Sequence, residues 1–316
     1  MNNFQKEKIL ICSSFTPPVN AGGGRNAYNF GKFLVKKGET VTLLSLNRKG
    51  KQKYKESDEG LKIRRLMYFN NNIITKIISL IIILPGYFFH IAKNNVVFIY
   101  GGNIIGYEII ILFGKLMKKK IVFQSLLMDE DDIDTLIKNR PGGKIRKHIL
   151  NKIDIYFSLN SAFTQIWKNN FTDSNKIFET VQGVDTSSFF GVNEEVKKKI
   201  RNRLNIPDKV FIIVTVGYLI ERKGFRGIFK ILSELDFPFY YLIIGDYKVS
   251  KDHYMFHLNK EMKKLYDQGK ALLGTKVIFM GPKTNILEYL NASDVFLLNS
   301  KQEGFPNAIL ESMACG

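Results

Sequence analysis

Two glutamates near the end of the chain, Glu303 and Glu311, are placed to act on one ligand. They lie eight residues apart in the stretch EGFPNAILE. A carboxylate can accept charge-assisted hydrogen bonds from two vicinal hydroxyl groups at once, as a ribose presents them. The pair is therefore a candidate site for a ligand that contains a ribose.

The elements around the two glutamates position both on the ligand side of a sheet. The apolar run Val295–Leu298 predicts a buried strand, and Pro306 before good helix formers predicts a helix that begins near Asn307. Glu303 is then in the connecting loop and Glu311 is on the second helical turn. Both point into the crevice beyond the carboxyl end of a strand, where open α/β sheets bind ligands. The N–H groups of the first helical turn suit a phosphate there.

This stretch resembles the E-x7-E signature of retaining, GT-B-fold glycosyltransferases of family 4, the glycosyl transferases group 1, which use nucleotide sugars. The resemblance covers the whole chain in outline and is densest in the second half. It implies that Glu311 holds the ribose and that Glu303 is catalytic and holds the sugar hydroxyls. It also implies donor contacts from the residues between them: Gly304, Phe305, Pro306, Asn307 and Ala308. Alternatively, both glutamates are solvated charges on an ordinary βα unit, but the EGFPN run and the closing ESMACG favour the signature.

A lysine in an earlier loop could neutralise a phosphate. The sequence GYLIERKG (217–224) follows an apolar predicted strand. It resembles the family's G-R-L-x-x-x-K-G, in which Arg and Lys hold the donor diphosphate. Lys223 and Gly224 match, whereas Tyr218 replaces the arginine, so half of the clamp is absent or is supplied by Arg222. A lysine in such a loop is usually only solvated, and the paired glycines favour phosphate binding.

A glycine-rich segment follows the first predicted strand, Lys8–Ser14, and precedes a helix predicted from about Asn26 to Lys37. Its match to the dinucleotide fingerprint G-x-G-x-x-A is weak, because prolines lengthen the turn and no acid ends the second strand. A glycine loop for close backbone approach fits better. It resembles the loop that family members place against the donor phosphates and the acceptor, which implies contacts from Gly23, Gly24 and Arg25.

No metal cofactor is expected. The acidic run 129–132 follows the predicted strand Ile121–Gln124 and could bind a metal, but four consecutive acids more often form a helix N-terminus. No D-x-D motif follows a strand in a convincing place. The charge of the leaving group should therefore fall on Lys223, on helix N-termini and on glycine-loop amides.

Strands and helices alternate along the chain, which predicts a doubly wound α/β fold in about two domains. The resemblance implies a GT-B architecture, with two Rossmann-like domains facing each other across a cleft. We place an acceptor-side domain at 1–190 and a nucleotide-sugar-binding domain at 191–316. The chain stops at Gly316, directly after the signature helix, where family members continue, so the second domain is expected to be incomplete. Other strands are predicted at Val41–Leu46, Lys62–Met67, Val96–Tyr100, Ile155–Leu159, Val210–Val216, Tyr240–Gly245 and Val277–Met280.

The net charge of +18 favours an anionic partner. No stretch interleaves aromatic and basic residues as single-strand nucleic-acid binders do, so an anionic membrane surface is the better prediction. Two distant cysteines and the lack of a signal peptide at Met1–Lys8 predict a cytoplasmic protein. The apolar segment Ile73–Ile91 is interrupted by Pro85-Gly86, which predicts a buried or membrane-facing helix kinked at Pro85 rather than a membrane span.

The predicted function is retaining transfer of a hexosyl or N-acetylhexosaminyl group from a nucleotide diphosphate sugar, such as a UDP-sugar, to an acceptor hydroxyl. The acceptor would be lipid-linked or a saccharide, in bacterial cell-surface polysaccharide or glycolipid synthesis at the inner face of the membrane. Two alternatives keep the same architecture: a sugar-nucleotide epimerase, or a phosphorylase. A third is a non-catalytic sugar-nucleotide-binding or scaffolding subunit, which Tyr218 and the early chain end favour slightly.

Overall fold

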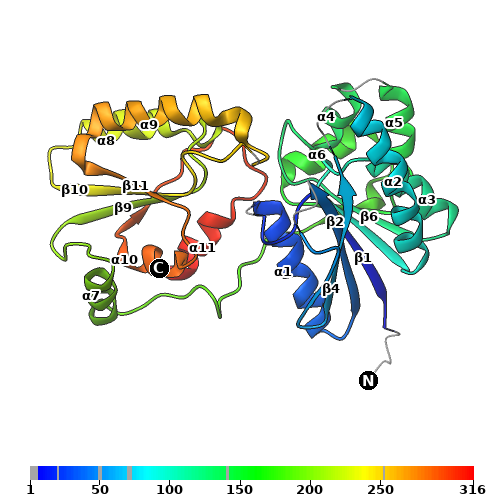
Figure 1. The fold of residues 1–316 in the computed structure, drawn as a ribbon, viewed down its shortest axis with the longest axis horizontal. Helices are drawn as coiled ribbons and strands as arrows, with labels where there is room; N and C mark the ends of the chain where they lie inside the picture. Colours follow the sequence, from blue (N-terminus) through cyan, green and yellow to red (C-terminus); the bar gives the residue numbers. More distant parts are fainter. Residues whose placement is uncertain (1–5, 20, 49–51, 70–72, 140–141, 252) are drawn as a thin grey trace. The chain divides into compact units, whose positions relative to one another are not determined.

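The computed structural model describes residues 6–19, 21–48, 52–69, 73–139, 142–251 and 253–316. Residues 1–5, which belong to the stretch Met1–Lys8 considered above for a signal peptide, therefore lie outside the described residues. The chain forms two compact units, 1–181 and 182–316 (Figure 1). The boundary predicted after Phe190 lies nine residues later. Phe189 packs into a core of the second unit, and the Phe190 carbonyl accepts a hydrogen bond from Asn291, so these residues follow the second unit.

The first unit is built on an eight-stranded sheet in the order β3-β4-β2-β1-β5-β6-β7-β8. All neighbouring strands pair parallel except β3 with β4. The sequence did not predict β3 or β8, because both are short and mostly exposed, without an apolar pattern. The strands are β1 Lys8–Ser13, β2 Thr40–Arg48, β3 Lys55–Asp58, β4 Leu61–Tyr68, β5 Val96–Tyr100, β6 Lys120–Gln124, β7 Ile155–Ser158 and β8 Ile177–Glu179.

Helices cover both faces of this sheet, because β4 has buried side chains on each of its two faces. Leu61 and Ile63 are buried in a cluster with Ala27 of α1, whereas α2 packs on β4 as well, beside Leu66. Successive odd and even residues of a strand point to opposite faces, so α1 and α2 lie on different sides. The helices are α1 Gly22–Lys36, α2 Ile73–Ala92, α3 Tyr107–Leu116, α4 Ile133–Lys138, α5 Gly143–Leu150 and α6 Ser161–Asn170.

One prediction about the helices of the first unit was wrong. Helix α1 begins at Gly22 rather than Asn26, with Ala21 in extended conformation as its N-cap, so the predicted glycine loop is the first helical turn. Helix α2 continues through Pro85 to Ala92. Pro85 is on the exposed side of α2, so the hydrogen bond that proline removes is lost away from the sheet. Among the described residues, no helix has the length and apolar character needed to cross a bilayer.

The second unit is built on a parallel four-stranded sheet in the order β11-β10-β9-β12. Its strands are β9 Phe211–Val216, β10 Phe239–Ile244, β11 Val277–Gly281 and β12 Val295–Phe296. Its helices are α7 Glu194–Arg203, α8 Phe225–Ser233, α9 Asn259–Leu273, α10 Ile286–Ala292 and α11 Asn307–Cys315, with the short 3₁₀ helix η2 at Glu221–Lys223.

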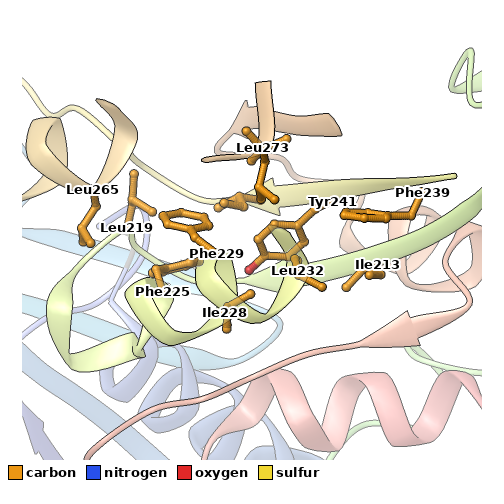
Figure 2. Packing of buried hydrophobic residues seen from close by; sticks show 12 residues of the cluster. Ile213, Leu219, Phe225, Ile228, Phe229, Leu232, Phe239, Tyr241, Leu265 and Leu273 are labelled. Atoms are coloured by element: carbon orange, nitrogen blue, oxygen red, sulfur yellow. The ribbon is translucent and has the colours of Figure 1, made fainter. Parts of the chain in front are cut away.

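Both faces of the second sheet are buried, which explains the continuous apolar runs of β9 and β10. On one face, Ile213 and Tyr241 pack with Phe225 and Phe229 of α8 and with Leu265 of α9 (Figure 2). On the other face, the alternate residues of the same strands pack with residues of α7 and α10: Ile212, Val214, Leu242 and Ile244 with Ile200, Tyr289 and Leu290.

Strand β12 was predicted to be buried, and it is not. It has two residues at the edge of the sheet, and Val295 is 41% exposed. The residue before β12, Asp294, holds the strand in position. The Asp294 carboxylate accepts hydrogen bonds from Arg201 (2.7 Å), Lys197 (2.7 Å) and the Ile212 amide (2.8 Å), which ties β12 to α7 and β9.

Candidate functional site

The candidate site lies in the second unit, where the loops after β9 and β12 meet. The Lys223 Nζ lies 2.5 Å from Glu303 Oε1, and the Arg222 guanidinium lies 3.5 Å from the other carboxylate oxygen. Arg222 also donates a hydrogen bond to the Gln302 carbonyl, and the Lys301 amide donates to the Arg222 carbonyl, both at 2.8 Å. The structure therefore brings together two predicted site segments that are 80 residues apart in the chain.

Gly224 allows the two loops to approach this closely. It has a left-handed backbone, with φ of +71°, and a Cβ added there would lie 1.8 Å from the Asn299 carbonyl oxygen. Another residue would therefore meet both backbone strain and a clash with the loop that follows β12. Gly224 thus has a local structural role, because it allows Lys223 to lie beside Glu303.

Burial and charge act in opposite directions on the central ion pair. The side chains of Lys223 and Glu303 are 15% and 21% exposed. Burial lowers the pKa of Lys223, and the Glu303 carboxylate opposes that shift. Burial alone would raise the pKa of Glu303, but Lys223 and Arg222 outweigh it, so the pKa of this carboxyl lies below its usual value. The arrangement offers a cation for a phosphate and an ionised carboxylate for hydroxyl groups.

Tyr218, which stands where the resemblance has an arginine, is part of a small apolar cluster with Ile220, Val249 and Met262. Its ring centroid lies 5.9 Å from that of His253. In this structure, the cation beside the Lys223–Glu303 pair is Arg222. Its binding role and that of Tyr218 stay predictions.

A cavity of about 410 Å³ opens at the carboxyl ends of β10 and β11. Burial raises the pKa of Asp246 in its wall, and His253 opposes that shift. Gly245-Asp246 directly after an apolar strand resembles the family's G-D-G turn, with Tyr247 in place of the second glycine, but no ligand contact was predicted for these residues. The cavity is lined by Asp246, Tyr247, Lys248, Val249, Ser250, Gly281 and Pro282.

The helix that carries Glu311 begins at Asn307, as predicted. Pro306 is its N-cap, with φ of −77° and ψ of 110°, and its first turn contains no acidic residue. Glu311 is half-buried on the second turn, and the loop residues from Glu303 to Pro306 are half-buried too. A helix start of this kind favours an anion, because its first amide groups lack intrahelical acceptors. The ligand contacts assigned to Gly304, Phe305, Pro306, Asn307, Ala308 and Glu311 remain predictions.

The predicted glycine segment belongs to the first unit. Gly23 and Gly24 are in the first turn of α1, and the Arg25 amide donates to the Ala21 carbonyl. A Cβ on Gly24 would lie 2.7 Å from the Phe15 carbonyl oxygen, so this glycine lets α1 start against the end of the preceding loop. The ligand contacts assigned to Gly23, Gly24 and Arg25 remain predictions.

The acidic run 129–132 has a structural role in this fold. Asp132 caps α4 by accepting a hydrogen bond from the Thr135 amide. Asp131 is buried and accepts hydrogen bonds from the amides of Gly102, Leu126 and Leu127, although burial raises its pKa to about 6. Within the described ranges, no group of three or more His, Cys, Asp or Glu side chains could hold a metal ion. Metal independence of the reaction stays a prediction.

Comparison with known proteins finds a family match in the second unit and a fold match over most of the chain. Residues 196–316 match the family model described as glycosyl transferases group 1. The N,N'-diacetylbacillosaminyl-diphospho-undecaprenol alpha-1,3-N-acetylgalactosaminyltransferase of Campylobacter jejuni is 27% identical over 165 residues, which are 51% of this chain and 40% of that protein. The UDP-Gal:alpha-D-GlcNAc-diphosphoundecaprenol alpha-1,3-galactosyltransferase of Escherichia coli is 29% identical over 157 residues, 47% of this chain and 37% of that protein.

The similarity of structures extends over nearly the whole chain. The crystal structure of Anabaena Alr3699/HepE in complex with UDP and glucose has a TM-score of 0.72 at 13% identity, covering 98% of this chain and 78% of that one. The predicted α/β fold of the GT-B class is therefore confirmed. The curated relatives match this chain over 29–40% of their own length.

Proposed function

We propose that this chain, whose residues 196–316 match the family model described as glycosyl transferases group 1, transfers a sugar from a nucleotide diphosphate sugar to an acceptor hydroxyl. The observation that carries the proposal is the contact between Lys223 and Glu303. It places one cation and one carboxylate together beyond the carboxyl ends of β9 and β12. A diphosphate requires the cation, and the hydroxyl groups of a sugar suit the carboxylate.

The ion pair also suggests how the donor enters the site. In this structure Lys223 is paired with Glu303, and Arg222 lies next to the same carboxylate. A bound diphosphate would take over Lys223 and Arg222, because it carries more charge than a single carboxylate. Glu303 would then be available to the hydroxyl groups of the sugar. The pair thus keeps both side chains ordered before the donor arrives.

The remaining parts of the donor have candidate partners in the same unit. Glu311 would accept the ribose hydroxyls, and the start of α11 would face a phosphate. The cavity beside Asp246 lies at the same edge of the sheet, where β10 and β11 end, and has room for a further part of the nucleotide. In this scheme, protein groups bind each part of the donor, and no metal ion is required.

The transfer step forms one bond and breaks one. The acceptor oxygen forms a bond to the anomeric carbon, and the bond from that carbon to the phosphate oxygen breaks. The acceptor proton passes to the departing phosphate, and Lys223 with Arg222 stabilises the negative charge that develops there. We expect retention of configuration, with the acceptor attacking from the side on which the diphosphate leaves.

The acceptor is proposed to be lipid-linked. The two relatives described above are named for substrates attached to diphospho-undecaprenol. By analogy, this protein would add a hexose or an N-acetylhexosamine to a saccharide on a polyprenyl carrier, at the inner face of the membrane. Gly23, Gly24 and Arg25 of the first unit are proposed to contact the acceptor and the donor phosphates.

The test is acceptor-dependent release of the nucleotide. The chain is incubated with UDP-galactose, UDP-N-acetylgalactosamine or UDP-glucose, with and without a synthetic undecaprenyl-diphosphate-linked sugar. UDP release that requires the acceptor, with a matching mass increase of the acceptor, supports the proposal. Lys223→Gln should abolish release, and Lys230→Gln, at an exposed position on α8, should not. The proposal is wrong if none of these donors yields a glycosylated acceptor although each binds.

A second candidate is a subunit that binds sugar nucleotides without transferring the sugar. It is favoured by Tyr218, which adds an apolar contact where the family resemblance has an arginine. This candidate predicts UDP binding that depends on Lys223 together with no turnover. Calorimetric titration with UDP beside the release assay separates the two functions.

A further inference from the structure

Helix α2 is apolar on both sides, although only one side packs on the sheet. Its buried residues recur at 79, 83, 87, 90 and 91. Its exposed large apolar residues recur at helical spacing as well, between 47% and 64% exposed: Ile74, Ile77, Ile78, Ile81, Ile82, Phe88 and Phe89. An apolar stripe with this period marks one face of a helix that contacts something apolar.

Helix α3 extends this surface. Leu112 and Leu116 of α3 are exposed, and Phe88 of α2 packs edge to face on Phe113 of α3, with 5.8 Å between ring centroids. Single exposed apolar residues are ordinary on proteins. A continuous set on two neighbouring helices is not, and we refer to these seven residues of α2 with Leu112 and Leu116 as the α2–α3 face.

Lysines gather where both helices end. The Lys119 Nζ donates a hydrogen bond to the Ala92 carbonyl at the end of α2 (3.0 Å). Lys118 and Lys120 are exposed beside it, and Lys93 follows α2 directly. Together with Lys115, the lysines at 118–120 line an open cavity of about 660 Å³, whose acidic residues are Glu7 and Asp154.

Of the two acids that line this cavity, Asp154 is paired with Lys115 at 2.8 Å, and neither acid belongs to α2 or α3. Helix α2 contains no Asp or Glu, and the single acid of α3, Glu108, is held by Arg146 at 2.8 Å. A second copy docked over this face would therefore leave the lysines without counterions. A bilayer with anionic lipids supplies both an apolar interior for the stripe and phosphate groups for the lysines.

We propose that the α2–α3 face docks on an anionic lipid bilayer, with α2 lying in the plane of the interface and the lysines at 93 and 118–120 against lipid phosphates. The net charge of +18 acts in the same direction. This inference deepens the proposed function, because a lipid-linked acceptor lies in a membrane. Its test uses neither donor nor acceptor, so membrane docking and the proposed sugar transfer can be refuted separately.

The apolar part is tested by co-sedimentation of the chain with vesicles of phosphatidylcholine and phosphatidylglycerol. The triple variant Ile74→Ser, Ile77→Ser, Ile81→Ser changes three exposed residues of the α2–α3 face and should lower the partition coefficient by about tenfold or more. The matched control is Phe33→Ser, Ile231→Ser, Leu272→Ser, which changes exposed apolar residues of α1, α8 and α9. It should bind as the unmodified chain does. Equal loss in both variants would overturn the proposal.

The charged part is tested by comparing vesicle binding of two double variants. The first is Lys118→Glu, Lys120→Glu, and the control is Lys198→Glu, Lys230→Glu. Both pairs are exposed and change the net charge equally, but the second pair lies on α7 and α8. Losing one lysine near an anionic surface lowers binding about fivefold, so the first pair should reduce it by about 25-fold or more. Binding should also fall steeply with salt. Equal partition into neutral and anionic vesicles would refute the inference.

A self-association measurement decides the remaining alternative. If the unmodified chain is a dimer without vesicles, and the α2 triple variant makes it a monomer without changing vesicle binding, the α2–α3 face is a contact between copies and the lipid proposal is wrong. Thermal unfolding of each variant confirms that it remains folded. Vesicle binding without sugar transfer would leave this inference standing and count against the proposed function alone.

Discussion

The Nζ of Lys223 lies 2.5 Å from Oε1 of Glu303, although 80 residues separate them in the chain. The lysine follows β9, and the glutamate follows β12, which pairs directly with β9. The carboxyl ends of neighbouring parallel strands lie at the same edge of a sheet, so sheet topology creates this contact. A site of this kind requires both loops.

Replacing Lys223 should remove most of the activity. Lys223→Gln keeps the length of the side chain but loses the charge that stabilises the leaving diphosphate, and kcat/KM should fall by about 10²- to 10³-fold. The measurement is steady-state UDP release with the lipid-linked acceptor. Activity within threefold of the unmodified chain, as expected for Lys230→Gln, would rule out the proposed catalytic role of Lys223.

Replacing Glu311 should weaken nucleotide binding. Glu311→Ala removes the carboxylate proposed to hold the ribose, and UDP affinity should drop by about 1–3 kcal/mol, the scale of hydrogen bonds to a charged group. Titration calorimetry with UDP measures this directly. Glu195→Ala, on exposed α7, is the control and should leave the affinity unchanged. An unchanged affinity in Glu311→Ala would refute the assignment of this residue.

Replacing Gly224 should damage the site through the backbone. An alanine at this left-handed position would have its Cβ 1.8 Å from the Asn299 carbonyl, so the loop that carries Lys223 must move away from Glu303. Gly224→Ala should lower UDP affinity and the midpoint of thermal unfolding together. The control is Gly183→Ala, where an added Cβ meets nothing within 4 Å. Equal affinities in these two variants would show that the close approach has no part in binding.

Asp294 should make the stability of the second unit depend on pH. Burial would raise the pKa of this carboxyl, but Lys197, the Ile212 amide and Arg201 outweigh it and hold the pKa below its usual value. A lowered folded pKa adds stability above the unfolded value of about 4, and this stability disappears as the pH falls through the folded pKa. Asp294→Ala should cost about 3 kcal/mol at pH 7, since Arg201 is buried, and less at pH 3.

Urea unfolding of Asp294→Ala and the unmodified chain at both pH values measures that difference. Glu195→Ala again serves as the control, because its ion pair with Lys199 is exposed and contributes little. A cost for Asp294→Ala that stays constant between pH 7 and pH 3 would show that the ionised carboxylate is not what stabilises β12.

Much of the fold could be predicted from sequence, because parallel strands buried on both faces are short apolar runs. Val96–Tyr100 was predicted with its observed bounds, and β9 and β10 to within one residue. The short strands β3 and β8 have no such run, and β12 is an edge strand that does not need one. Helix α2 continues through Pro85, because tertiary packing holds it together across a residue that disfavours helix locally.

The candidate site was predicted in its parts but not in its assembly. Glu303 and Lys223 were each recognised from the residues around them. Their contact depends on β12 pairing with β9, which no local pattern encodes. The cavity beside Asp246 was missed for the same reason, since loops after β10 and β11 form it together. Long-range pairing, rather than local preference, decides which recognised residues meet.

The two-residue strand β12 has a consequence for the order of folding. Its pairing with β9 closes a loop of about 80 residues, and the entropy of that closure is recovered through a short edge ladder, the hydrogen bonds of Asp294 and the contacts of the next loop with Arg222 and Lys223. The segment from β12 onward should therefore be the first part of the second unit to open and the last to form. A nucleotide that bridges Lys223 and Glu311 would fasten this segment, so amide hydrogen exchange along α11 should slow when UDP binds.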